Sequence, residues 1–78
     1  IDPQHGFTSD YLPEAVTDRT IMTIAPHVVI VADHTKLGVV STVFLAPIST
    51  AHLIITDTEA PEDIVAELEE LGVDLLLV

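Results

Sequence analysis

The chain has 78 residues, of which 13 are acidic and two, Arg19 and Lys36, are basic, so its formal net charge is −11 at pH 7. This charge argues against direct contact with nucleic acid, because binding to a phosphate backbone depends on basic side chains that displace counterions. No cysteine is present, which excludes disulfides and thiolate metal sites, and no apolar run is long enough for a membrane span, so we expect a cytoplasmic domain or part of one.

The first third of the chain is predicted to be a loop followed by a helix. Residues 1–9 contain proline, glycine and short polar side chains, which favour a loop. A helix is expected over residues 10–25, with Asp10 as its cap and Pro26 as its stop. Arg19 lies on or beside the apolar stripe of this helix, and no acid lies three or four residues from it. The partner of Arg19 must therefore come from elsewhere in the fold or from a ligand.

Three apolar runs, over residues 28–32, 53–55 and 73–78, are predicted to be strands. None of them alternates with polar residues, which is typical of a parallel sheet that is buried on both faces. A helix is expected over residues 60–72, so the last two strands and this helix form a βαβ unit with a right-handed crossover.

The segment between the first two of these strands is predicted to hold a short strand over residues 42–45 and a single helical turn over residues 47–51. The chain thus offers two helices to cover a parallel sheet, which needs cover on both faces. Either more of the same domain or another copy of the chain must supply the remainder.

Candidate binding residues follow the first two predicted strands of the sheet. Asp33 ends the first strand in "VADHTK" and Asp57 ends the second in "IITDTE". Ligands of open α/β sheets bind beyond the carboxyl ends of the strands. Lys36, Thr35 and Gly38 supply an ammonium group, a hydroxyl and backbone N–H groups loosened by glycine, from which an anion site can be built.

An alternative role for Lys36 is a simple ion pair. Opposite charges at about 4 Å are worth roughly 4 kcal/mol at an effective dielectric constant near 20. A single lysine among so many acids would be drawn to Asp33 or Asp57, and the pair would do no more than order the loop.

The rest of the sequence offers few candidates for catalysis or for metal or cofactor binding. Of the four histidines, only His34 lies beside the candidate site, and a surface or loop-packing role is favoured for each of them. No two histidines have the i, i+4 spacing of a zinc-protease helix, and no nucleophile elbow, phosphate-binding P-loop or dinucleotide fingerprint occurs. We therefore expect no catalytic residue, no metal and no cofactor.

The segments "VVIVADHTKLG" and "LAPISTAHLIITD" together resemble the effector-sensing domain of DeoR-type transcriptional repressors. The family signature is similar to Ala-Asp-x-[Ser/Thr]-Lys-[Phe/Leu/Trp]-Gly, followed about twenty residues later by Leu-[Ile/Val]-Thr-Asp. The upstream "ID", "HGFT" and "EA" and the final "ELGVDLLLV" also match, so the resemblance covers nearly the whole chain. It implies a three-layer αβα domain with a mainly parallel sheet, shared with ribose-5-phosphate isomerase, glucosamine-6-phosphate deaminase and coenzyme A transferases.

The resemblance also implies a function and a site. Members of the family bind a phosphorylated sugar or a related anionic metabolite, and thereby release an operator held by a separate N-terminal winged helix-turn-helix. Residues 1–78 would be the C-terminal portion of the sensing domain, without the glycine-rich phosphate loop of its first half and without the DNA-binding part. Lys36 would contact the effector. The other positions that the resemblance assigns to the same cleft or its opposite rim are Asp33, Thr35, Gly38, Asp57, Gly6, Phe7 and Thr8.

Two further functions stay open at this point. An enzyme related to the sugar-phosphate isomerases would use Asp33 or Asp57 as general base and Lys36 to hold the phosphate. A third possibility is an oligomerisation module without a ligand. Unpaired apolar strands in so short a chain are an aggregation hazard, so we expect a homo-oligomer in any case.

Overall fold

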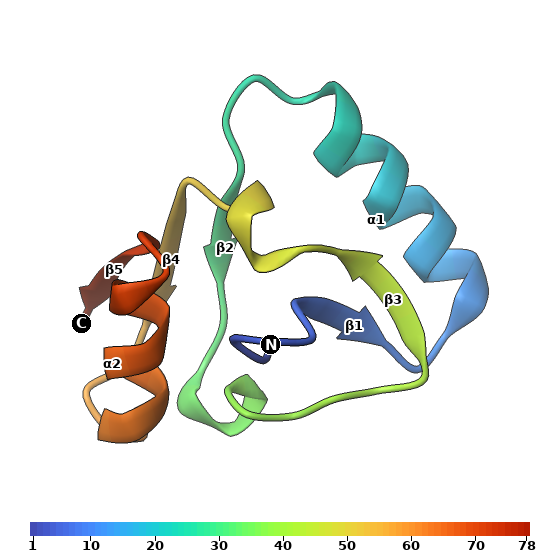
Figure 1. The fold of residues 1–78 in the computed structure, drawn as a ribbon. Helices are drawn as coiled ribbons and strands as arrows, with labels where there is room; N and C mark the ends of the chain where they lie inside the picture. Colours follow the sequence, from blue (N-terminus) through green and yellow to red (C-terminus); the bar gives the residue numbers. More distant parts are fainter.

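The computed structural model describes residues 1–78 as two small sheets and two helices (Figure 1). The first sheet is an antiparallel pair of β1 (Phe7–Ser9) and β3 (Val43–Ala46). The second sheet is parallel, with strand order β2-β4-β5, and consists of β2 (Val29–Val31), β4 (Leu53–Thr56) and β5 (Asp74–Leu77). The expected α/β class with a parallel sheet is confirmed.

Helix α1 (Leu12–Ile24) packs against β1 and β3 and ends just before Pro26, as predicted (Figure 1). The prediction that Asp10 caps it is wrong. The N-cap is Tyr11 in extended conformation, without a side-chain hydrogen bond, and Pro13 fixes the first turn instead.

Arg19 on α1 donates a hydrogen bond to the backbone carbonyl of Phe44 in β3. The missing partner of Arg19 is therefore a backbone oxygen of the fold. The guanidinium group therefore links α1 to the antiparallel pair, and its role is structural.

The βαβ unit of the sequence analysis is confirmed as β4, α2 (Glu62–Glu70) and β5. Gly72, at φ +85°, makes the left-handed turn after the helix that the sequence indicated. Two single 3₁₀ turns complete the chain, η1 (His34–Lys36) and η2 (Ile48–Thr50), and the second is the helical turn predicted over residues 47–51.

Strand β1 was not predicted, because residues 7–9 carry turn-forming neighbours and have no apolar run. Their partner, β3, follows more than thirty residues later, with Phe7 opposite Ala46 and Ser9 opposite Val43. Non-local pairing, rather than local propensity, makes this segment a strand.

The core joins the two sheets and α2. Its buried members are Phe7, Ala46, Ala51, Ile54, Leu68 and Val73. Ile54 and Leu68 are fully buried, which places the contact between β4 and α2 at the centre of the fold.

This chain covers one face of the parallel sheet and leaves the other open, which agrees with the expectation that two helices cannot cover both faces. Ile30, Ile54 and Leu75 lie side by side across the sheet and face the core. On the other face Val31 is 75% exposed and Leu76 is 48% exposed. Because α1 packs on the antiparallel pair and α2 lies on one face of the sheet, no element of this chain covers the second face. Neither helix is long and apolar enough to cross a membrane.

Candidate functional site

The loop that leaves the carboxyl end of β2 is held in a tight turn by Asp33. Its Oδ1 atom accepts a hydrogen bond from the backbone N–H of Thr35 at 2.9 Å, and it also accepts one from the Thr35 hydroxyl. The Asp33 carbonyl accepts from the backbone N–H of Lys36 at 3.1 Å. Asp33 and Thr35 therefore shape the loop on which Lys36 stands.

His34, in the same turn, reaches the end of the neighbouring strand. Its backbone N–H donates to Oδ2 of Asp57 at 2.9 Å, and its ring Nδ1 lies 3.0 Å from the same oxygen and 3.1 Å from Oδ1. The backbone N–H of Glu59 donates to Oδ1 of Asp57 at 2.9 Å. The carboxyl ends of β2 and β4, which are neighbours in the parallel sheet, are thus joined by these hydrogen bonds. The sequence analysis did not predict the hydrogen bonds between His34 and Asp57, although the position of His34 next to Asp33 at a strand end placed it near the candidate site.

These contacts shift three pKa values. The pKa of Asp57 is lowered by the hydrogen bonds from the backbone and ring of His34. The pKa of His34 is raised, mainly by its hydrogen bond to Asp57. The pKa of Asp33 is lowered, first by the hydroxyl and then by the backbone N–H of Thr35. The two carboxylates therefore stay ionised near neutral pH, and the imidazole ring keeps its proton to a higher pH than an ordinary histidine does.

Backbone N–H groups of this loop are not available to an anion, which corrects the expectation from the sequence. Each N–H from residue 34 to residue 38 already has an acceptor within the chain. The N–H of Gly38, for example, donates to the carbonyl of Ile1 at 2.7 Å. Gly38 itself has a φ of +81°, so glycine is required for the turn. Any ligand bound here must be met by side chains.

Lys36 is exposed, and no carboxylate oxygen lies within 4.0 Å of its ammonium group. The alternative in which Lys36 pairs with Asp33 or Asp57 is therefore wrong. The physical reason is competition, because both carboxylates already accept several short hydrogen bonds from donors that the fold holds close to them. Lys36 makes no ion pair at contact distance, and its charge acts on Asp33 only as a minor cause of the lowered pKa of that carboxyl group.

Gly6, Phe7 and Thr8 lie apart from this turn. Gly6, at φ +74°, packs against the backbone that leads from β3 into η2, and Phe7 is buried in the core. The Thr8 hydroxyl accepts a hydrogen bond from the backbone N–H of Ser41 at 2.9 Å. Neither Gly6 nor Thr8 hydrogen-bonds to η1 or to Asp57.

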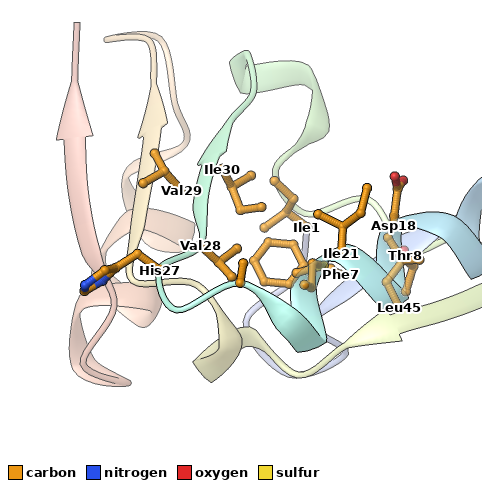
Figure 2. Close-up of a pocket in the computed structure, with 12 residues that line it drawn as sticks. Ile1, Phe7, Thr8, Asp18, Ile21, His27, Val28, Val29, Ile30 and Leu45 are labelled. Atoms are coloured by element: carbon orange, nitrogen blue, oxygen red, sulfur yellow. The ribbon is translucent and has the colours of Figure 1, made fainter.

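A separate hollow of about 390 Å³ lies between α1 and β2. Figure 2 shows the Phe7 ring near its centre, with Ile21 and Val28 beside it. Its polar members include Thr8 and Asp18, and it contains neither Lys36 nor Arg19. An apolar hollow with an acid at its edge is not suited to a phosphate group.

Donor atoms of His34, Asp57 and Glu59 lie within 4.8 Å of one another. Nδ1 of His34 is already hydrogen-bonded to Asp57, and the side chain of Glu59 is 78% exposed. Nδ1, the ring nitrogen that faces these carboxylates, carries the proton of the hydrogen bond to Asp57 and so has no lone pair to offer a cation. We therefore assign this cluster to hydrogen bonding between the two strand ends and not to a metal.

Comparison with known families identifies one matching family. The family model of the DeoR C-terminal sensor domain matches residues 1–58, which is 58 of the 78 residues and includes η1 and Asp57. No curated protein and no solved structure matches the chain. The chain belongs to the DeoR C-terminal sensor domain family, whose members are regulatory rather than catalytic.

Proposed function

We propose that this domain binds a phosphorylated sugar or a related anionic metabolite at the carboxyl ends of β2 and β4, with Lys36 as its principal contact. The single observation that carries the proposal is that Lys36 has no ionic partner in a chain with 13 acids. The position of Lys36 also supports the proposal, because ligands of parallel sheets bind beyond the carboxyl ends of the strands.

The surrounding residues order the site in this proposal. Asp33 and Thr35 close the turn that carries Lys36, Gly38 lets the chain leave it, and Asp57 fixes it to the end of β4. A rim role for Gly6 and Thr8 stays a prediction from the family resemblance.

The test is a titration of the protein with a panel of sugar phosphates by calorimetry. We expect Lys36→Gln to weaken the binding of the best ligand about tenfold or more, since a hydrogen bond to a charged group contributes roughly 1.5–3 kcal/mol. Arg19→Gln is the matched control. It removes the same charge from the chain, lies on α1, and keeps an N–H donor for the carbonyl of Phe44. Equal affinity in wild type and Lys36→Gln would contradict the proposal.

We further propose that ligand binding controls DNA binding by a separate winged helix-turn-helix. The charge of −11 supports this division, because residues 1–78 are unsuited to contact DNA themselves. In a gel-shift assay with the complete gene product, the sugar phosphate that binds here should change the affinity for its operator, and Lys36→Gln should abolish that response.

The isomerase alternative has less support. A general base needs an available lone pair and a pKa near the working pH. Asp33 and Asp57 have lowered pKa values, and their oxygens already accept hydrogen bonds from the loops. Turnover of ribose 5-phosphate by the protein would favour the enzyme.

Self-association is also part of the proposal. Val29 and Val31 are 52% and 75% exposed on the uncovered face of the parallel sheet. Apolar side chains grouped in this way favour burial against another surface. Sedimentation equilibrium should report a dimer or a larger assembly, and a monomer at all concentrations would contradict this part.

A further inference from the structure

The way η1 is hydrogen-bonded restricts how it could hold an anion. Its backbone N–H groups all have acceptors, and the Thr35 hydroxyl donates to Asp33. The side chains of the turn that keep unused donors are Lys36, with its ammonium group, and His34, with the second nitrogen of its ring.

Asp57 holds the His34 ring so that one nitrogen stays free. Nδ1 faces both oxygens of Asp57, at 3.0 and 3.1 Å, while the backbone N–H of the same histidine binds that carboxylate at 2.9 Å. Two attachment points fix the ring and require the proton on Nδ1. Nε2 has no partner in the chain, and the His34 side chain is 37% exposed.

The charges around the ring determine when Nε2 can donate. Asp57 and Glu59, in the turn after β4, and Asp33, in the same loop as His34, all favour the protonated ring, and they raise its pKa. In the protonated state Nε2 carries a proton and a share of the positive charge, whereas in the neutral state it is an acceptor. The carboxylate of Asp57 accepts several donors and is thereby partly neutralised toward an incoming anion.

We propose that Nε2–H of His34 is the second cationic contact of the effector, beside Lys36, and that Asp57 is the positioning residue that aims it. This inference rests on the proposed function and specifies its ligand. Two cationic side chains on the same turn, His34 and Lys36, favour a doubly charged oxyanion, such as a phosphate monoester or sulfate, over a single carboxylate. Binding should then weaken as the pH rises and His34 loses its proton.

Sulfate is the suitable probe, because its charge is constant across this pH range, whereas a phosphate monoester titrates near pH 6. We would measure its affinity from pH 5.5 to 8.5 by NMR, with a chelator present to exclude metal-bridged binding. The matched variant is His34→Asn, whose amide can replace Nδ1 toward Asp57 but has nothing in place of Nε2.

At low pH we expect His34→Asn to bind sulfate roughly tenfold more weakly than wild type, as for the loss of one charge-assisted hydrogen bond, and to show no pH dependence. Asp57→Asn should move the pH midpoint of binding downward. The ring signals of His34 should respond to sulfate, while those of His5, His27 and His52 should not.

The outcomes separate this inference from the proposed function. If Lys36→Gln weakens binding but His34→Asn matches wild type at every pH, the contact from His34 is wrong and the proposed function stands. If wild type binds neither sulfate nor any sugar phosphate, both are wrong. Unchanged amide spectra of His34→Asn outside η1 would show that a lost affinity is not a lost fold.

Discussion

Gly6 offers a direct test of how β1 is held against β3. A Cβ atom at this position would lie 2.4 Å from the carbonyl oxygen of Ala46 and 3.1 Å from the backbone nitrogen of Ile48. Contacts below 3.0 Å are essentially never seen for real Cβ atoms, so in Gly6→Ala the backbone at residue 6 and that of Ala46 must separate by at least 3.0 − 2.4 = 0.6 Å. The neighbouring atoms are backbone and cannot rotate away.

The cost of Gly6→Ala has two parts. The φ of +74° is unfavourable for any residue with a side chain, by roughly 1–2 kcal/mol. The overlap adds about 1–3 kcal/mol, which is typical of overpacking in a core. We therefore expect the free energy of unfolding to fall by about 2–5 kcal/mol.

Gly72→Ala is the matched control for Gly6→Ala. Gly72 has a similar φ of +85°, but nothing lies within 4 Å of its added Cβ, so only the conformational cost of about 1–2 kcal/mol applies. Urea denaturation followed by circular dichroism measures both variants. If Gly6→Ala were no less stable than Gly72→Ala, the close packing of Gly6 on β3 would be wrong.

Three further predictions concern His34, Thr56 and Arg19. In an NMR titration, the pKa of His34 should lie above the ordinary 6.5 and should fall in Asp57→Asn. The contribution of His34 to stability is complete below its unfolded pKa of 6.5 and is lost as the pH rises through its raised folded pKa. The contribution of Asp57 is complete above its unfolded pKa of 3.8 and is lost as the pH falls through its lowered folded pKa. The pair therefore stabilises the fold most between pH 3.8 and pH 6.5. Thr56 is buried and its hydroxyl has no hydrogen-bond partner, so Thr56→Val should raise the free energy of unfolding by up to about 1 kcal/mol, measured by urea denaturation. A clear loss of stability would show that the hydroxyl has a hydrogen-bond partner in solution. Arg19→Ala should lower stability by about 1 kcal/mol in the same assay, through its hydrogen bond to Phe44, and an unchanged midpoint would mean that this bond is not formed in solution.

Local patterns in the sequence predicted the elements that form locally. The unit of β4, α2 and β5 follows from an apolar run, a helical stripe opened by Pro61, and a glycine after the last turn. Strand β1 could not be found in this way, because its partner β3 is distant in the sequence. The rule that ligands bind beyond the carboxyl ends of parallel strands pointed to Asp33 and Asp57 at one edge of the sheet, but it did not predict the hydrogen bonds from His34 to Asp57.

The prediction for Lys36 shows what the sequence could not supply. Coulomb's law alone favoured a pair between the lysine and an aspartate. In the folded chain, the backbone N–H of Thr35 donates a hydrogen bond to Asp33, and that of His34 donates one to Asp57, each at 2.9 Å. Donors that the turn already holds in place lose less entropy on binding than a long, flexible ammonium chain does. The ion pair could be weighed as an alternative from charge alone, but choosing between it and a free lysine required the geometry of the turn.

The same comparison explains how so acidic a domain could bind an anion. Of its two fixed cations, Arg19 is engaged by the carbonyl of Phe44, and only Lys36 is left without a partner. Acids far from the site are screened at physiological ionic strength, where the Debye length is about 8 Å. Asp33, Asp57 and Glu59 are close. The first two are occupied by hydrogen-bond donors of the two loops, and the side chain of Glu59 is exposed to solvent. On the proposed function, the local arrangement around η1 therefore decides the sign of the ligand, and the total charge of the chain does not.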